Sequence, residues 1–133
     1  AIAGAPRLAF VLVTPPIAVS TANVYAALEA TPPARPADEG GFLRALRSGD
    51  LRRLAALLYN RLEDAPGPHR GEVERLKRLL IGHGALGAAM SGSGPSVFGL
   101  AADLGEARGI AERIAGEIGE GALLHAGLTG GSV

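Results

Sequence analysis

Two short apolar runs joined by a glycine-rich hexapeptide constrain the fold of this chain more than any other feature. The runs lie near residues 86–90 and 96–101, and the connection between them reads Ser91-Gly-Ser-Gly-Pro-Ser96. A tight connection between antiparallel strands commonly needs positive φ angles, which glycine adopts without steric cost. We therefore expect Gly92 and Gly94 to take conformations closed to residues with a Cβ atom. The segment predicts a β-hairpin.

The same connection is also suited to binding anions. Successive backbone N–H groups in a glycine turn can form a concave nest for anionic oxygens, and Ser91 and Ser93 add hydroxyl donors. A plain turn is the more common explanation of such a pattern when it is taken alone. Both interpretations therefore stay open at this point.

The rest of the chain alternates between strand-like and helix-like patterns. The β-branched-rich run Leu8 to Val13 ends at Pro15-Pro16, which predicts a buried strand. Ala122 to Ala126 predicts a last strand, followed by a glycine-rich tail that we expect to fray. Apolar residues at helical spacing predict five helices. The first is capped by Ser20 or Thr21 and has Val24, Ala27 and Leu28 on one face, the second lies around Phe42 to Leu46, and the third starts at Asp50 and carries Leu51, Leu54, Leu58 and Leu62. The fourth runs from Glu72 to Ile81, and the fifth has Ala107, Ile110, Ala111, Ile114 and Ile118 on its apolar face.

The order of these elements predicts the fold class. Strand, helices, strand, strand, helix, strand is the split β-α-β arrangement. We expect an α+β fold with a ferredoxin-like antiparallel sheet and extra helices in the first crossover. A length of 133 residues fits one domain, 1–133.

Composition excludes several classes of protein and site. The chain has no cysteine, which excludes disulfides and thiolate metal sites. Its formal net charge of zero argues against a nucleic-acid partner. No apolar run approaches the ~20 residues of a membrane span, and the segment Ala1 to Pro6 lacks the features of a signal peptide. We expect a cytoplasmic protein with no membrane partner, and the start without methionine suggests a piece of a longer chain.

The residues alone do not form a convincing catalytic group or metal site. His69, His83 and His125 are scattered singly, which favours structural or surface roles. Asp38 and Asp50 precede helical segments and predict helix caps. We expect Glu63-Asp64 to be solvated at a helix end. The arginines at 44, 47, 52 and 53 predict exposed helical faces, with a phosphate-facing cluster as the alternative.

The order of the motifs resembles a known family. The segment Pro15-Pro-Ile-Ala-Val-Ser-Thr21 and a helix with Tyr25 precede Met90-Ser-Gly-Ser-Gly-Pro-Ser-Val-Phe98 by some 65 residues. From about Leu8 to Ala126, the chain resembles the carboxy-terminal half of the GHMP kinases. The Val-Ser-Thr segment and its aromatic resemble the branch that acts on 4-diphosphocytidyl-2-C-methyl-D-erythritol. Asn60-Arg-Leu-Glu63 stands where that branch usually has Asn-Asp-Leu-Glu, so Arg61 departs from the pattern.

This resemblance implies an ATP-dependent kinase of non-mevalonate isoprenoid biosynthesis, which phosphorylates the 2-hydroxyl of that substrate. It implies that ATP and Mg²⁺ are bound mainly by an amino-terminal half, which is the expected partner domain. The phosphate loop of that half is missing from this sequence and Lys77 lies on a helix face, so no catalytic residue and no metal ligand is expected here. Thr21 and Tyr25 would lie beside the cytosine. The substrate and its phosphates would be approached by a loop of Ser91, Gly92, Ser93, Gly94, Pro95 and Ser96.

Three alternatives compete with this expectation. A kinase of the homoserine or mevalonate type would share the loop, although the Val-Ser-Thr segment and Tyr25 argue against it. A ferredoxin-like ligand-binding domain without enzymatic activity would need no catalytic residues. Tyr25 itself could be an ordinary aromatic of a helix core. A glycine-rich phosphate loop and a catalytic aspartate upstream would distinguish a kinase from a binding domain.

Overall fold

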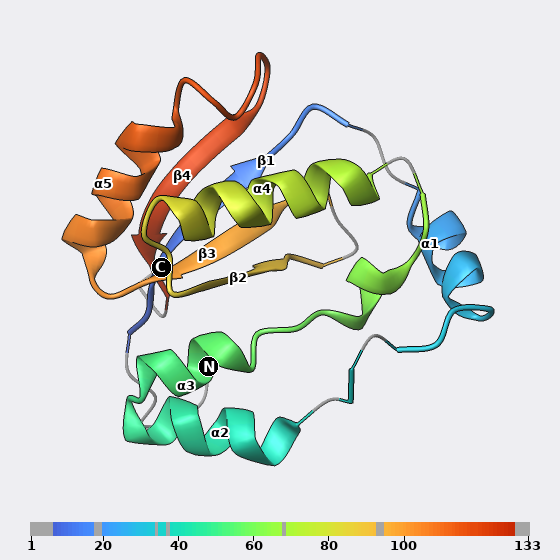
Figure 1. The fold of residues 1–133 in the computed structure, drawn as a ribbon, viewed down its shortest axis with the longest axis horizontal. Helices are drawn as coiled ribbons and strands as arrows, with labels where there is room; N and C mark the ends of the chain where they lie inside the picture. The colour runs from blue at the N-terminus through green and yellow to red at the C-terminus, as the bar shows by residue number, and fades with distance from the viewer. Residues whose placement is uncertain are drawn as a thin grey trace.

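Four strands, five α-helices and one 3₁₀-helix form the part of the chain that the computed structural model describes, residues 7–17, 20–33, 35–36, 38–67, 69–92 and 95–129 (Figure 1). In chain order they are β1 (Ala9–Thr14), α1 (Thr21–Leu28), α2 (Glu39–Ser48), α3 (Leu51–Ala56), the 3₁₀-helix η1 (Arg61–Asp64), α4 (Arg70–Gly82), β2 (Gly87–Met90), β3 (Val97–Ala101), α5 (Leu104–Ile114) and β4 (Leu123–Leu128).

The strands form one antiparallel sheet in the order β2-β3-β1-β4. β2 and β3 are the hairpin that the Gly-Ser segment predicted, and β1 lies in the middle, with Val11 opposite Gly99 on one side and Ala126 on the other. Helices α1 to α4 all lie in the crossover from β1 to β2. The predicted α+β, ferredoxin-like fold with extra helices in its first crossover is confirmed.

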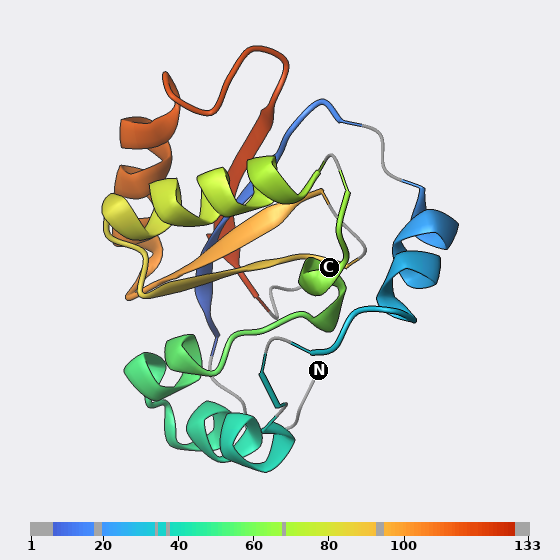
Figure 2. The same ribbon diagram turned by 45° about the vertical axis from the view of Figure 1, so that its right-hand side comes forward.

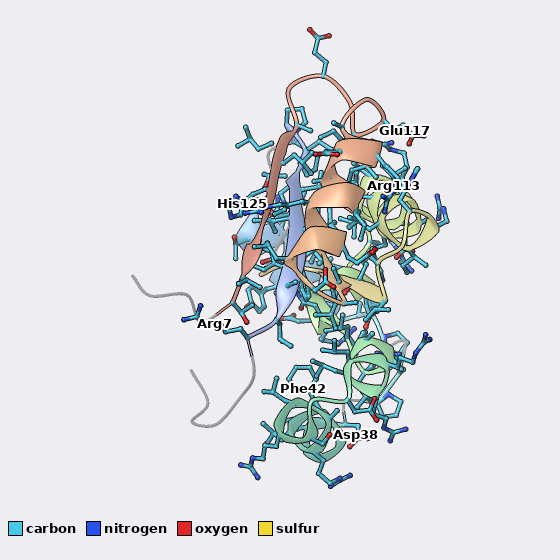
Figure 3. The ribbon with its side chains drawn as sticks, turned by 90° about the vertical axis from the view of Figure 1, so that its left-hand side faces the viewer. Arg7, Asp38, Phe42, Arg113, Glu117 and His125 are labelled. Atoms are coloured by element: carbon cyan, nitrogen blue, oxygen red, sulfur yellow. The ribbon has the colours of Figure 1, made fainter. Side chains whose placement is uncertain are left out.

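The alternation of side chains along the strands gives the sheet two different faces. Ala9, Val11 and Val13 are buried against α4 and α5 in the main core. Figure 3 views the molecule from the side and shows His125 of β4 on the side of the sheet opposite Arg113 of α5 and Glu117. The helix layer therefore covers one face only.

The opposite face is covered at one end by α2 and α3, which lie together and apart from α4 and α5 (Figure 2). Leu54 and Ala55 of α3 pack there in a second, smaller core with Leu100. Beside this core lies an apolar groove of about 390 Å³. Its lining comprises Leu8, Phe10, Leu12, Phe42, Leu54, Leu58, Ser91, Phe98, Leu100 and Thr129.

Acidic and hydroxyl side chains start the helices as the sequence predicts. Asp38 accepts a hydrogen bond from the Gly41 N–H, and Asp50 accepts one from the Arg53 N–H. Ser20, rather than Thr21, caps α1. These caps satisfy backbone donors that have no partner within the helix.

One predicted helix is wrong. The leucines at 51, 54, 58 and 62 predicted a single helix, but α3 ends at Ala56 and Leu62 lies in the separate η1. The physical reason is that these leucines serve two cores. Leu51, Leu54 and Leu58 pack in the smaller core, whereas Leu62 packs against the main one. A straight helix presents all four leucines on one face and cannot reach both cores.

The predicted end of the last strand is also wrong. β4 continues to Leu128, and Thr129 is still paired, because its N–H donates to the Leu8 carbonyl at 2.7 Å. The Leu8 N–H in turn donates to the Thr129 hydroxyl at 2.9 Å. Pairing with the start of β1 therefore orders residues that composition alone marked as a fraying tail.

Arg75 joins α4 to the segment after α5. Its guanidinium donates to the carbonyl oxygens of Glu117 and Ile118 at 2.9 and 3.0 Å. It also pairs with Glu72, and this hydrogen bond lowers the pKa of the Glu72 carboxyl. The contribution of Glu72 to stability is therefore present above its unfolded-state pKa and is lost as the pH falls.

Candidate functional site

The expected site residues lie at one end of the sheet, where β1 ends, β2 turns into β3 and α1 stands alongside (Figure 2). We call residues Ser91 to Ser96 the Gly-Ser loop. Ser91, Gly92, Pro95 and Ser96 are described, while Ser93 and Gly94 lie outside the described residues, as do Ala18 and Val19 of the segment before α1.

Hydrogen bonds fix both ends of the Gly-Ser loop. The Ser91 N–H donates to the Ser96 carbonyl at 2.8 Å, which closes the turn. The hydroxyls of Ser96 and Thr14 share a hydrogen bond of 2.8 Å, which ties the loop to the end of β1. Gly92 has a φ of +61°, so its predicted left-handed conformation is confirmed. The same prediction for Gly94 falls outside the described residues.

A Gly92→Val substitution tests whether this conformation matters beyond forming a turn. A Cβ at Gly92 meets no atom of the described residues within 4 Å, so the expected penalty is backbone strain. That strain is about 1–2 kcal/mol in the left-handed region. For the kinase that the sequence predicts, we expect Gly92→Val in the full-length protein to lower kcat/KM at least tenfold, while the melting temperature falls by only a few degrees.

Gly92→Asn is the matched control, because asparagine tolerates the left-handed region. It should retain most of the activity. Equal losses for Val and Asn would contradict the role of backbone conformation. A loss of folding by Val with no separate effect on activity would identify a plain turn.

Helix α1 presents Tyr25 to solvent. Val24 anchors the helix with a side chain that is only 3% exposed, whereas Tyr25 is 56% exposed. Thr21 is the first helical residue and is exposed as well. The alternative that Tyr25 is a helix-core aromatic is therefore wrong, and the ring is accessible in the described structure.

The segment from Asn60 to Asp64, which we call the connecting segment, lies between α1 and the start of the Gly-Ser loop. Its Glu63 was expected in solvent, but Glu63 and Asp64 are buried, with 8% and 6% of their surfaces exposed. The Glu63 carboxylate pairs with the Lys77 ammonium at 2.6 Å and accepts from the Met90 N–H at 3.0 Å. The prediction of a solvated pair is wrong because these partners compensate the buried charge of Glu63.

Asn60 connects this segment to the loop. Its side-chain nitrogen donates to the carbonyl oxygens of Met90 and Gly92 at 2.9 and 2.6 Å. Its side-chain oxygen accepts from the Leu62 N–H at 3.0 Å, and Glu63 accepts from the Asn60 N–H at 3.1 Å. Asn-x-x-Glu is a capping-box pattern, which is the sequence signal that could have located η1.

Arg61 connects the same segment to α1. Its guanidinium donates to the carbonyl oxygens of Leu28, the last residue of α1, and Thr31. It also forms an ion pair of 3.0 Å with Asp64. The residue that departs from the Asn-Asp-Leu-Glu pattern thus holds the carboxyl end of the helix that carries Tyr25.

The remaining polar candidates lie apart from one another. The His83 Nε2 atom lies 2.9 Å from a Glu117 carboxylate oxygen, and the His125 ring centre lies 5.8 Å from that of Phe10. His69 is buried. The arginines at 44, 47, 52 and 53 are exposed, as predicted. Within the described ranges, no three His, Asp or Glu side chains group in a way that could hold a metal ion.

A family model decides the family. The family model described as "GHMP kinases C terminal" matches residues 42–121. The chain belongs to this family. The four-stranded antiparallel sheet with helices between its strands matches the fold of a GHMP kinase carboxy-terminal domain.

Two curated relatives of the chain have the same name. The chain is 47% identical over 108 residues to the 4-diphosphocytidyl-2-C-methyl-D-erythritol kinase of Pelotomaculum thermopropionicum, covering 81% of this chain and 38% of the relative. It is 45% identical over 112 residues to the enzyme of the same name from Moorella thermoacetica, covering 82% and 39%. The chain therefore spans about two fifths of the length of these relatives.

Solved structures agree with the fold. A crystal structure of 4-(cytidine 5'-diphospho)-2C-methyl-D-erythritol kinase superposes with a TM-score of 0.70 at 30% identity, covering 96% of this chain and 45% of that one. A mevalonate kinase from L. major gives a TM-score of 0.68 at 25% identity, covering 94% of this chain and 44% of that one.

None of the helices described for this chain has the length and apolarity that crossing a bilayer requires.

Proposed function

We propose that this chain is the substrate-facing, carboxy-terminal part of a kinase that transfers the γ-phosphoryl group of ATP to the 2-hydroxyl of 4-diphosphocytidyl-2-C-methyl-D-erythritol. The observation that carries the proposal is the 47% identity over four fifths of the chain to a kinase of that name. The exposed Tyr25 and the Gly-Ser loop, whose two ends are joined by a hydrogen bond, lie at the same end of the sheet and support it.

The residues of this end have distinct roles in the proposal. Tyr25 offers its ring to the cytosine, and Thr21 lies one helical turn away as a polar neighbour. The proposal assigns the Gly-Ser loop to the phosphates and the sugar alcohol, because backbone N–H groups of a glycine turn can bind anionic oxygens. Positioning and charge neutralisation supply most of the catalysis in phosphoryl transfer.

ATP and Mg²⁺ belong to the amino-terminal part in this proposal. Lys77 is the single lysine of the chain and is paired with Glu63, so it is not free to contact phosphates. Among the described residues, no three His, Asp or Glu side chains are grouped so that they could hold a metal ion. We place the amino-terminal part against the apolar groove, because the groove borders Ser91 and the amino-terminal part would then cover its apolar side chains.

A kinase of the mevalonate type is the second candidate, favoured by the TM-score of 0.68 to a mevalonate kinase. That similarity supports the shared domain fold rather than the substrate. The exposed aromatic on α1 favours a substrate with a planar base, because neither mevalonate nor homoserine has a ring to contact Tyr25.

A phosphoryl-transfer assay tests the proposed activity. The full-length protein, with ATP and Mg²⁺, should phosphorylate 4-diphosphocytidyl-2-C-methyl-D-erythritol, whereas the isolated chain should fold and remain at the rate of a heat-killed control. The reason is that this chain supplies one wall of the site only. Turnover by the isolated chain, or none by the full-length protein, would contradict the proposal.

A further inference from the structure

We propose that the connecting segment, Asn60 to Asp64, positions the two substrate-facing elements independently of each other. Asn60 and Glu63 hold the Gly-Ser loop, and Arg61 holds α1. The inference deepens the proposed function and rests on it for its kinetic part. The positioning itself is visible in the hydrogen bonds and has a separate structural readout.

Three hydrogen bonds, which we call the loop arm, join the segment to Met90 and Gly92, and a fourth within the segment supports them. Asn60 donates to the carbonyl oxygens of Met90 and Gly92, and Glu63 accepts from the N–H groups of Met90 and Asn60. Met90 is the last residue of β2 and is 1% exposed, so both of its main-chain polar groups are satisfied by this segment. The loop therefore leaves the sheet in a direction that Asn60 and Glu63 set.

The ion pair beneath this arm makes Glu63 rigid. The Lys77 ammonium lies 2.6 Å from one carboxylate oxygen, while the other oxygen takes the two backbone hydrogen bonds. The side chains are 24% and 6% exposed, which limits screening by solvent. Lys77 belongs to α4, so the main helix layer supports the loop through Glu63.

The helix arm consists of Arg61 alone. Its guanidinium donates to the carbonyls of Leu28 and Thr31 while Asp64 fixes its orientation through an ion pair. Carbonyls at the end of a helix lack intrahelical partners and carry partial negative charge, so a cation there is favourable. α1 has no basic residue in its own last turn, and Arg61 supplies that charge from a distance of 33 residues along the chain.

Two variants separate the arms. Asn60→Ser keeps an N-cap oxygen for η1 but is too short to donate to the loop carbonyls, and it adds no charge. Arg61→Ala removes the helix arm and leaves the loop bonds in place, while the buried Asp64 carboxylate keeps its hydrogen bond from the Tyr59 hydroxyl. Glu63 is not substituted, because breaking a buried ion pair can prevent folding. Arg52→Ala on α3 is the matched control, since Arg52 is exposed and lies outside the segment.

Amide hydrogen exchange in the full-length protein is the structural readout. Asn60→Ser should speed exchange in residues 88–97, where the Ser91 N–H reports loop closure, and leave residues 21–31 unchanged. Arg61→Ala should speed exchange in residues 21–31 and leave residues 88–97 unchanged. Arg61→Lys should partly restore the protection of residues 21–31, because it keeps the positive charge. Arg52→Ala should resemble the parent. Equal changes in both regions for both variants would overturn the proposal.

Steady-state kinetics is the functional readout. Asn60→Ser should lower kcat by roughly 10- to 100-fold with a small change in KM, because a displaced loop misplaces the reacting groups. Arg61→Ala should raise KM for the diphosphocytidyl substrate roughly fivefold or more through displacement of Tyr25, with KM for ATP unchanged. Parallel changes of kcat and both KM values would overturn the proposal. If the parent protein does not use this substrate, the proposed function fails, and the exchange pattern alone decides the inference.

Discussion

Tyr25→Ala in the full-length protein is expected to raise KM for 4-diphosphocytidyl-2-C-methyl-D-erythritol by roughly 5- to 150-fold. This range corresponds to the loss of an aromatic–base contact of about 1–3 kcal/mol. KM for ATP should change little, because the proposal assigns the nucleotide to the amino-terminal part. Since Tyr25 is 56% exposed, the melting temperature of the isolated chain should stay nearly constant.

Two further variants make this measurement specific. Tyr25→Phe should cost little if the face of the ring matters, and more if its hydroxyl donates a hydrogen bond. Glu29→Gln, at the other end of α1, should leave both constants at their parent values. If the constants for ATP and the diphosphocytidyl substrate rise together in Tyr25→Ala, Tyr25 is not a specificity residue.

Leu76→Ala is expected to be the most destabilising of the substitutions described. Leu76 lies on the buried side of α4 and is 0% exposed in the main core. Truncating a buried leucine costs about 2–5 kcal/mol because a cavity remains. For a domain of this size the melting temperature should fall by roughly 10 °C, measured by circular dichroism on the isolated chain.

Ile81→Ala on the same helix is the matched control. Its side chain is 51% exposed, so little burial is lost. The free energy of unfolding should change by about 0.5 kcal/mol or less. Similar losses for the two variants would contradict the packing of α4 on the sheet.

Local patterns were sufficient to predict most of the fold. The turn at Ser91 to Ser96 predicted the hairpin, and the order of strands and helices along the chain predicted the ferredoxin-like arrangement. The caps at Asp38 and Asp50 followed from their position before helical segments. These features depend on neighbours in the sequence, which a single chain displays directly.

The capping box of Asn60 and Glu63 is a local pattern, but the long-range contacts of the connecting segment could not be predicted in this way. These long-range contacts join residues that lie 14 to 33 positions apart, such as Glu63 with Lys77 and Arg61 with Leu28. The spacing of the leucines predicted one continuous helix through this region, and the charge of Glu63 predicted that its side chain lies in solvent. Only the two cores and the buried partners of Glu63 show why the helix ends at Ala56 and why the carboxylate is inside.

A competition assay tests the central claim, that this chain forms the cytidine-specific wall of a GHMP kinase. The full-length protein is given ATP and Mg²⁺ with equal concentrations of 4-diphosphocytidyl-2-C-methyl-D-erythritol, mevalonate and homoserine, and the phosphorylated products are quantified by mass spectrometry. We predict that phosphate enters the diphosphocytidyl substrate almost exclusively. Preferential phosphorylation of mevalonate or homoserine, or a mixture that stays unphosphorylated, would contradict the claim.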